Sequence, residues 1–398
     1  MELRLDAGKW RRRRGMKRLL AALGAEQGLT RFVGGAVRDD LLGNPISDID
    51  LATRIPPEEV VRKLEAARIK AVPTGIDHGT ITAVSDGQPV EITTLRRDVS
   101  TDGRRATIAY TDDWKEDAAR RDFTINALSA DPISGEIFDY FDGLADLQTR
   151  HIRFIGDPLQ RIAEDHLRIL RFFRFHARFG AGDPDQAALA ACTARANDLM
   201  ALSRERIADE LLKLLAAADP SPTVAVMLGN AILAPVLPEI GREALASLRS
   251  LVAAERDAGL EPDPLRRLAA LLPRDPGVAD DVAVRLRLSN KARKRLACAA
   301  GTERFPTPQA LSYRLGCVCA VDRLLIDTQP AEAAAIAKWK APRLPITGGA
   351  LIGRGLPEGP IVATSLRQIE DRWVEQGFPS GNAFERIVAD VLATARTS

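Results

Sequence analysis

The pattern of apolar and polar positions divides the chain into two stretches of different character. Between about residues 30 and 142, short β-like runs alternate with helical patterns, whereas after about residue 151 only helical spacing is found. The expected strands are residues 31–33, 48–52, 80–84, 90–95 and 136–140, and the clearest expected helices are residues 36–42 and 57–67. This pattern predicts an α+β fold, in which a mixed sheet with helices precedes an all-helical remainder.

Turn residues refine the expected organisation. Asp86-Gly87, between two expected strands, is a hairpin signal and predicts an antiparallel pair. Clusters of Pro and Gly separate the later helices, and residues 342–360 are expected to form a loop before a last helix from about residue 383. Residues 96–113 are expected to be a flexible loop. The predicted segments are an N-terminal extension at 1–29, the α/β part at 30–149, and helical parts at 150–218 and 219–398.

Composition narrows the class of protein. The 45% of apolar residues and 28% of charged residues exclude a mostly disordered chain, and the net charge of +2 does not by itself indicate a nucleic-acid binder. The longest uncharged stretch, residues 220–238, is interrupted by Pro and Gly, which predicts two short buried helices and no membrane span. The basic run at residues 9–17 is not followed by the apolar segment of a signal peptide.

Cysteine usage bears on the compartment. The chain has four cysteines, which suggest no disulfide framework and contain no C-x2-C pair of the kind that binds zinc: Cys192, Cys298, Cys317 and Cys319. These features predict a soluble protein of the cytoplasm, in a reducing environment.

The most informative stretch joins a glycine pair to two aspartates. Gly34-Gly35 stands between an expected strand and an expected helix, where backbone N–H groups can approach a bound anion closely. Asp48 and Asp50 stand at i and i+2 of the next expected strand, so both side chains point to one face. Two carboxylates facing one spot need a cation between them, and oxygen ligands alone favour Mg²⁺. Glu91, on a neighbouring expected strand, is the candidate for a third carboxylate.

Arginines recur on one face of a later expected helix. Arg168, Arg171, Arg174 and Arg178 step by three, three and four residues and form one ridge, flanked by apolar stripes. No acidic residue that follows Asp165 in this helix can pair with them. Asp165 and Arg168, one turn apart, would place an acceptor beside a fork of donors, which complements the edges of cytosine and adenine. Guanine and uracil present a different order, so this helix is predicted to select C and A.

These motifs resemble those of the class II tRNA nucleotidyltransferases (CCA-adding enzymes) and the related bacterial poly(A) polymerases. The similarity extends from about residue 32 to residue 179. It rests on Gly-Gly-x-Val-Arg-Asp, Asp-x-Asp, Arg-Arg-Asp-Phe-Thr-Ile-Asn-Ala at residues 120–127, the segment 139–147, and Glu-Asp-x-x-Arg-x-x-Arg at residues 164–171. The resemblance implies a polymerase β-like nucleotidyltransferase head with a mixed sheet, followed by an all-helical neck, body and tail.

The resemblance also implies roles at the catalytic centre. Asp48 and Asp50 would ligate the catalytic Mg²⁺, with Glu91 as a weaker third candidate. Gly35 and Arg38 would contact the phosphates of the incoming nucleotide.

Further roles concern the rest of the nucleotide. Arg121 would bind the triphosphate or the sugar, Asp165 and Arg168 would read the base, and Arg171 and Arg174 would support the nucleotide site. Asn126 is expected to fix a turn rather than to take part in catalysis.

The activity that the resemblance implies is template-independent transfer of CMP and AMP from CTP and ATP to the 3′ end of tRNA, as in CCA addition and repair. A poly(A) polymerase, or an enzyme that adds only A or only CC, is the alternative within the family. A non-catalytic RNA-binding protein on the same scaffold is the alternative from another class. Because no histidine follows His176, the HD phosphohydrolase domain of some family members is excluded.

Binding partners are expected to be ATP, CTP and the tRNA 3′ end, with no membrane and no obligate protein partner. Two basic clusters, at residues 9–14 and 291–295, are candidates for contacts with tRNA phosphates.

Overall fold

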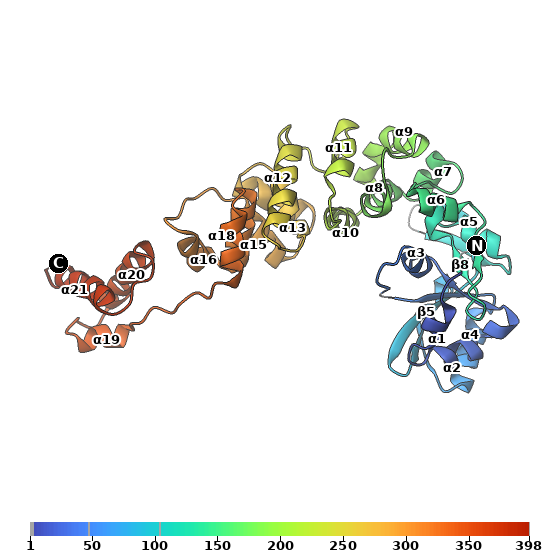
Figure 1. The fold of residues 1–398 in the computed structure, drawn as a ribbon, viewed down its shortest axis with the longest axis horizontal. Coiled ribbons are helices and arrows are strands. Elements are labelled where there is room, and N and C mark those ends of the chain that lie inside the picture. Colours follow the sequence, from blue (N-terminus) through green and yellow to red (C-terminus); the bar gives the residue numbers. More distant parts are fainter. Residues whose placement is uncertain (1–3, 47, 103–104, 398) are drawn as a thin grey trace. The chain divides into compact units, whose positions relative to one another are not determined.

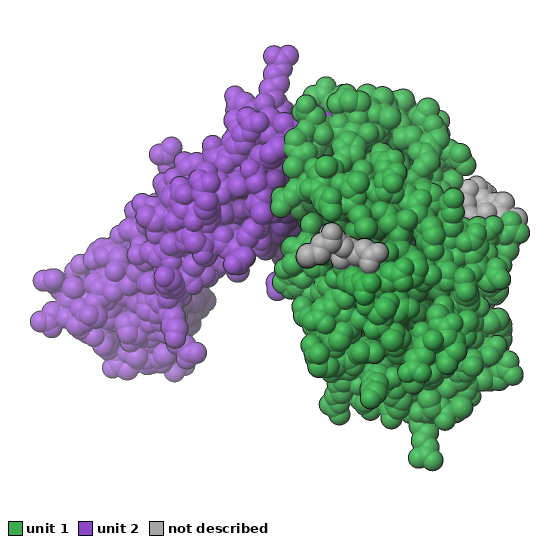
Figure 2. Space-filling model, turned by 45° about the vertical axis from the view of Figure 1, so that its right-hand side comes forward, with its two compact units in different colours: residues 1–203, 227–235 green, residues 204–226, 236–398 purple. Residues whose placement is uncertain are grey.

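The computed structural model describes residues 4–46, 48–102 and 105–397. Its contacts divide the chain into two compact units, shown in two colours in Figure 2: residues 1–203 with 227–235, and residues 204–226 with 236–398. The described strands belong to the first unit, and the second is helical (Figure 1). The predicted α+β class is therefore confirmed, whereas the finer division at residues 149 and 218 stays a prediction. In the described part of the chain, no helix is both long and apolar enough to span a bilayer.

The first unit is built on a seven-stranded mixed sheet with the order β3-β4-β5-β2-β1-β8-β9. The strands are β1 (Thr30–Val33), β2 (Asp50–Thr53), β3 (Lys70–Gly75), β4 (Thr80–Ser85), β5 (Gln88–Thr94), β8 (Ser129–Ala130) and β9 (Ile137–Phe138). Strand β2 lies between β1, to which it is antiparallel, and β5, to which it is parallel. Residues 51–53 of β2 are buried, while Asp50 at its start is exposed. Strand β2 therefore begins with an exposed acidic residue, Asp50, at the end of the sheet.

The hairpin predicted at Asp86-Gly87 is confirmed, and two predictions nearby are wrong. Asp86 and Gly87 both have positive φ angles, of 51° and 81°, as a type I′ turn requires, and they join the antiparallel strands β4 and β5. The expected loop at 96–113 contains a second sheet, β6 (Arg96–Asp102) and β7 (Arg105–Tyr110), and β3 was not expected at all. Strands rich in Arg, Asp and Thr carry little of the apolar alternation that reveals a strand.

Helices cover the sheet and extend the first unit. They are α1 (Ala7–Arg11), α2 (Met16–Ala22), η1 (Ala25–Gln27), α3 (Gly35–Leu41), α4 (Pro57–Ala66), η2 (Ile76–His78), α5 (Trp114–Ala119), η3 (Thr124–Asn126), α6 (Gly143–Thr149), α7 (Pro158–Glu164), α8 (Arg168–Phe179), α9 (Gln186–Ala194) and η4 (Ala196–Ala201). An aromatic cluster attaches α8, because Phe123 lies 5.0 Å from Phe175 and 4.9 Å from Phe154 between ring centroids. The sequence motif that contains Phe123 is thereby packed against α8.

The chain after residue 203 forms further helices. They are α10 (Arg204–Leu215), α11 (Ser221–Gly229), α12 (Ala244–Asp257), α13 (Pro264–Leu271), α14 (Pro276–Arg285), α15 (Asn290–Ala299), α16 (Pro308–Leu315), α17 (Cys317–Ile326), α18 (Pro330–Lys338), α19 (Gly348–Gly353), α20 (Pro360–Glu375) and α21 (Asn382–Thr397). The last helix begins within one residue of its predicted start. Residues 220–238 contain one helix rather than two, and the expected loop at 342–360 contains α19, because short segments between Pro and Gly can still close a single helical turn.

One disulfide departs from the cysteine prediction. Cys298 of α15 and Cys319 of α17 are bonded, while Cys192 and Cys317 are free. The pairing was not visible in the sequence because the two cysteines are 21 residues apart and meet only when α15 packs on α17. Disulfides are uncommon in reducing compartments, so this pair counts against the reducing environment that the cysteine spacing favoured.

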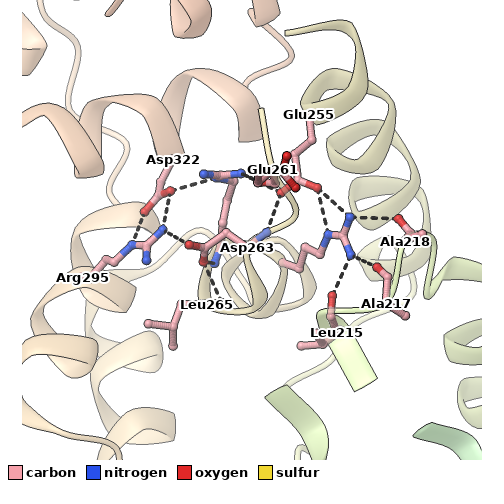
Figure 3. A network of polar contacts seen from close by, with 11 residues as sticks. Leu215, Ala217, Ala218, Glu255, Glu261, Asp263, Leu265, Arg295 and Asp322 are labelled. Carbon is pink, nitrogen blue, oxygen red and sulfur yellow. Dashed lines mark hydrogen bonds and ion pairs between the residues drawn. The ribbon is translucent and has the colours of Figure 1, made fainter. Parts of the chain in front are cut away.

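A buried set of ion pairs holds the second unit together (Figure 3). The side chain of Arg267 is 1% exposed and donates to Glu255 through Nε at 2.9 Å. Its other nitrogens donate to the carbonyl oxygens of Leu215, Ala217 and Ala218, which close the end of α10. The last carbonyls of a helix have no partner within the helix, so a buried cation stabilises this end.

The same set extends to α15 and α17. Arg266 donates to Glu255 at 2.7 Å and to Asp322 at 2.9 Å, and Arg295 donates to both oxygens of Asp322 and pairs with Asp263 at 2.8 Å (Figure 3). We call these six charged residues the body network: Glu255, Asp263, Arg266, Arg267, Arg295 and Asp322. Three cations meet three anions within it, so burial leaves no net charge.

Candidate active site

The sheet brings Asp50 next to Glu91 and next to the glycine turn. In the strand register, Asp50 lies opposite Val33 of β1 on one side and opposite Glu91 of β5 on the other. Side chains opposite one another on paired strands share a face of the sheet. Glu91, the candidate for the third carboxylate, is thus a direct neighbour of Asp50.

Asp48 lies two residues before Asp50, just outside β2 rather than within the strand predicted at 48–52. Ile49 between them is buried, whereas both aspartates are exposed. The alternation therefore continues past the end of the strand, and Asp48 and Asp50 face the same side as expected.

The carboxylates oppose one another electrostatically. Burial raises the pKa of Asp50 above its ordinary value, the negative charges of Glu91 and Asp48 raise it further, and the positive charge of Arg121 lowers it. Asp50 as a residue is exposed, but its carboxyl group lies among enough protein atoms to lose part of its hydration. A carboxylate in such surroundings is stabilised by a cation.

The glycine turn provides a close approach for Arg121. Gly34 has a φ angle of +69°, and a Cβ atom placed there would lie 2.8 Å from Nη1 of Arg121. That same nitrogen donates to the carbonyl oxygen of Asn126 at 3.3 Å, and Asp117 lies 3.5 Å from Nη2. Burial lowers the pKa of Arg121, and the charge of Asp117 opposes that shift. Gly34 is therefore required both for its backbone angle and for the space that Arg121 occupies.

Arg38, which is predicted to contact the phosphates of the nucleotide, makes its described contacts within the protein. Its side chain is 7% exposed, and its nitrogens donate to Asp39 at 3.0 Å and to Oδ1 of Asn126. Its guanidinium also lies 4.1 Å above the ring of Phe179 from α8. These contacts hold α3 against its neighbours, so Arg38 supports the glycine turn rather than extending toward a ligand. Gly35 begins α3 directly beside it.

Asn126 and Asp122 connect this turn to α8. Nδ2 of Asn126 donates to Asp122 at 2.9 Å, and Nε of Arg171 donates to the other oxygen of Asp122 at 2.8 Å. Burial by itself raises the pKa of Asp122, but the charge of Arg171 and the hydrogen bonds outweigh it, so the pKa is lowered. Asn126 therefore does more than fix a turn. Sequence reasoning missed Asp122, although its place in the Arg-Arg-Asp motif was a signal.

The arginine ridge of α8 finds its acids elsewhere in the chain. Arg171 pairs with Asp122, and Arg178 lies 4.0 Å from Asp39 of α3. Arg174 lies 4.4 Å above the ring of Phe175. No acid within the helix pairs with these arginines, as the sequence indicates, and tertiary packing supplies partners that are distant in sequence.

The predicted base-reading pair does not lie on one helix. Asp165 ends α7 with an extended backbone, and its Oδ1 accepts from the N–H of Leu167, just before α8 begins at Arg168. Arg168 donates through Nη1 to Glu164 and to the carbonyl oxygen of Arg161 at 2.9 Å. In the described contacts, both bonds use the same nitrogen, which leaves the other donors of the fork for a further partner.

The donor set suits a hard divalent cation. Asp48, Asp50 and Glu91 offer only oxygen atoms, and the pKa of Asp50 is raised first by desolvation and then by the negative charges of Glu91 and Asp48. Among the described residues, no group of three His, Cys, Asp or Glu side chains is arranged to hold a metal ion by itself. Mg²⁺ typically takes one or two carboxylates and completes its shell with water and substrate phosphates, which this arrangement permits.

Two family models match successive parts of the chain. The family model described as the Poly A polymerase head domain matches residues 30–153, and the one described as the probable RNA and SrmB-binding site of polymerase A matches residues 183–243. The mitochondrial CCA tRNA nucleotidyltransferase 1 of Homo sapiens is 33% identical over 387 residues, which cover 92% of this chain and 87% of that protein. The CCA-adding enzyme of Lacticaseibacillus paracasei is 32% identical over 366 residues, which cover 88% and 89%.

Solved structures share the fold along nearly the whole chain. The Thermotoga maritima CCA-adding enzyme complexed with tRNA(CCA) superposes with a TM-score of 0.70 at 22% identity, covering 99% of this chain and 100% of that one. The Bacillus stearothermophilus CCA-adding enzyme in complex with CTP gives a TM-score of 0.69 at 24% identity, covering 96% and 98%. With a third of its residues shared with full-length curated relatives, the chain belongs to the family of class II CCA-adding enzymes and poly(A) polymerases.

Proposed function

We propose that this protein adds C, C and A to the 3′ end of tRNA, transferring CMP and AMP from CTP and ATP without a nucleic-acid template. The observation that carries the proposal is the convergence of Asp50, Glu91 and Asp48 beside the Gly34 turn and Arg121. Relatives that cover most of the chain bear the name of this activity, and solved relatives hold CTP or tRNA. Nucleotidyl transfer needs carboxylates that can hold a metal next to a triphosphate site, and the neighbouring acidic residues beside the glycine turn support this assignment.

The carboxylates form the catalytic centre in this proposal. Asp48 and Asp50 would hold Mg²⁺, and Glu91 would act as the third carboxylate. When bound, Mg²⁺ supplies activation of the attacking 3′-hydroxyl and stabilisation of the leaving pyrophosphate. Asp50 contributes by keeping a negative charge at the centre of the sheet edge, where only a cation relieves the repulsion from its neighbours.

The triphosphate would be bound beside the glycine turn. Arg121 lies against Gly34 and carries a charge that a phosphate can pair with. Gly35 opens α3 and offers backbone close to the same place. Arg38 would act on the nucleotide indirectly, because its own donors are engaged by Asp39 and Asn126. Arg171 and Arg174 would support the site from α8.

Base selection would use Asp165 and Arg168 across the break between α7 and α8. The proposal requires the free part of the Arg168 fork to face the base while Nη1 stays with Glu164. Fixing that nitrogen to α7 restricts the rotation of the guanidinium. A restricted fork discriminates between base edges better than a mobile one, because a mismatched edge leaves buried groups unpaired.

One experiment distinguishes CCA addition from the alternative activities. Purified protein is incubated with tRNA transcripts that end before CCA or after CC, and with an unrelated RNA, while ATP, CTP, UTP and GTP are supplied singly and together. The proposal predicts addition of C, C and A to the first transcript, A to the second, and nothing from UTP or GTP. Long A tails on any RNA would indicate a poly(A) polymerase, addition of only A or only CC a partial enzyme, and binding without addition a non-catalytic RNA-binding protein.

The proposal places the reaction in the cytoplasm, where ATP, CTP and tRNA are present together, although the Cys298–Cys319 disulfide is a feature uncommon in that compartment. Two mammalian relatives are mitochondrial by name. Fractionation of the source cells with an antibody against the protein tests this part separately from the activity.

A further inference from the structure

The N-terminal run of arginines is ordered and lines a groove. Arg11, Arg12, Arg13, Arg14, Lys17 and Arg18, together with Asp86, surround an open groove of about 880 Å³. Six cations therefore face a single carboxylate. Such a surface is costly by itself, because like charges repel, and it is stabilised by an anionic partner.

Three contacts keep the cations in place. Trp10 of α1 is fully buried and packs against Phe32 of β1 in a tilted arrangement with a centroid distance of 4.6 Å. Gly15, between α1 and α2, approaches the β4–β5 hairpin so closely that a Cβ atom there would lie 2.6 Å from the carbonyl oxygen of Ser85. Arg18 pairs with Asp86 of that hairpin at 2.9 Å. The groove is thus a preorganised part of the first unit.

Only some of the cations in the groove have contacts within the protein. Arg13 donates to the carbonyl oxygen of Ile46, and Arg12 lies 4.0 Å from Asp6. Within the described residues, the side chains of Arg11, Arg14 and Lys17 have no hydrogen bond or ion pair. These three are the residues that a ligand would engage.

We infer that this groove binds the phosphodiester backbone of an RNA, and that tRNA is its ligand if the proposed function holds. Arginine pairs with phosphate through two parallel donors, and a row of such sites fits a polyanion better than a single small anion. Arg13 contacts Ile46, two residues before Asp48, so the groove borders the loop that leads to the catalytic strand. RNA with its 3′ end at Asp50 can therefore reach the groove.

An anionic membrane is the other polyanion to consider, and the surface does not suit it. Basic helices that bind bilayers also present exposed large apolar side chains. The exposed large apolar residues among the described ones all lie elsewhere, from Ile76 onward, while Trp10, Leu19 and Leu20 are buried. The groove therefore offers cations for phosphate contacts without the exposed large apolar side chains that a bilayer would bind.

The test compares a neutralised groove with a matched control. The variant R11Q/R14Q/K17Q removes the three cations without partners, and R62Q/K70Q/K115Q removes three exposed cations of the same unit outside the groove. Binding to tRNA and to an unrelated duplex RNA is measured between 50 and 300 mM salt. The groove variant should bind tRNA about tenfold or more weakly at low salt, and its plot of log affinity against log salt should be shallower by about two, while the control matches the wild type.

Two outcomes overturn the inference. One is tRNA binding by the groove variant with the affinity and salt dependence of the wild type. The other is loss of binding to phosphatidylserine vesicles with RNA binding unchanged, which would assign the groove to a membrane. Nucleotide addition to a two-nucleotide primer, too short to reach the groove, should fall at least tenfold less than addition to tRNA. If the wild type adds no nucleotide, but the groove variant still binds RNA more weakly than the wild type does, only the proposed function is contradicted.

Discussion

The charges of the acid cluster in the first unit (Asp48, Asp50 and Glu91) and those of the body network in the second are compensated to very different extents. In the cluster, Asp50 lies among like charges and its pKa is raised. In the body network, Asp263 is paired with Arg295, and although burial by itself raises its pKa, the hydrogen bonds and charges of its partners lower it. The comparison indicates that the network contributes to folding, while the cluster keeps a negative charge that Arg121 compensates only in part.

A similar contrast holds for the two basic clusters seen in the sequence. In the cluster at 291–295 both arginines have acidic partners, because Arg293 pairs with Asp280 at 2.5 Å and Arg295 belongs to the body network. The cluster at 9–14 is exposed and lines a groove. Runs of basic residues that look alike in sequence thus divide into one that stabilises the fold and one that is available to a partner.

The largest effect is expected from Asp50→Asn, which tests whether the acid cluster acts in catalysis rather than in folding. We expect nucleotide addition to fall by about 1000-fold or more, since charge stabilisation in the transition state is lost. The melting temperature should not fall, because a repelled carboxylate has been replaced by a neutral group. Turnover is measured by primer extension and stability by calorimetry, with Glu65→Gln on α4 as the control. Near-normal turnover of Asp50→Asn would contradict the catalytic assignment.

The next effect concerns the body network and is one of stability. Asp322 is 1% exposed and accepts from two arginines, so Asp322→Asn should cost about 3–5 kcal/mol of unfolding free energy by leaving buried cations unpaired. Asp327 follows on the same helix, is 50% exposed and pairs with Arg274, so Asp327→Asn should cost about 1 kcal/mol or less. Hydrogen exchange of α13 and α17 in urea measures both variants. Equal losses would show that burial does not distinguish the two pairs.

A smaller effect on activity is expected from Asn126→Ala, which removes the connection between Arg38 and Asp122. The variant leaves the buried Nη1 of Arg38 without its side-chain acceptor and removes one of the two hydrogen bonds to Oδ1 of Asp122, which still accepts from the N–H of Phe123, at a cost of about 1–3 kcal/mol. We expect about tenfold slower addition, with ATP and CTP affected alike, because Asn126 positions the turn rather than the base. A selective loss with one nucleotide would instead assign Asn126 to base selection.

The smallest effect is a difference in how stability depends on pH. The folded pKa of Asp50 is raised, so the folded state takes up this proton first and stability increases as the pH falls through that pKa toward the ordinary value. Asp122 has a lowered pKa, so its contribution is present above the ordinary value and is lost as the pH falls through the folded pKa. Subtracting the pH–stability curve of Asp50→Asn from that of the wild type should show the contribution of Asp50. The same subtraction with Asp122→Asn should show the contribution of Asp122. If both difference curves change in the same direction with pH, the predicted contrast between Asp50 and Asp122 is contradicted.

The local parts of the fold and the acid cluster were open to prediction from sequence. Helices α3 and α4, the Asp86-Gly87 turn and the last helix lie where periodicity and turn residues placed them. The pair Asp48 and Asp50 was predicted because spacing of i and i+2 places side chains on one face whatever the tertiary fold. Predictions failed for strands rich in polar residues and for the disulfide, where no local pattern marks the pairing.

The sequence by itself determined the fold class, the acidic strand, the glycine turn and the family, because each depends on residue types at short spacing. The tertiary structure alone decided which charges are compensated. It paired Arg171 with Asp122 and Arg295 with Asp322, and left Arg11, Arg14 and Lys17 on a groove. The physical reason is that an arginine has the same donors everywhere, while the desolvation and the partners that give it a role come from segments distant along the chain.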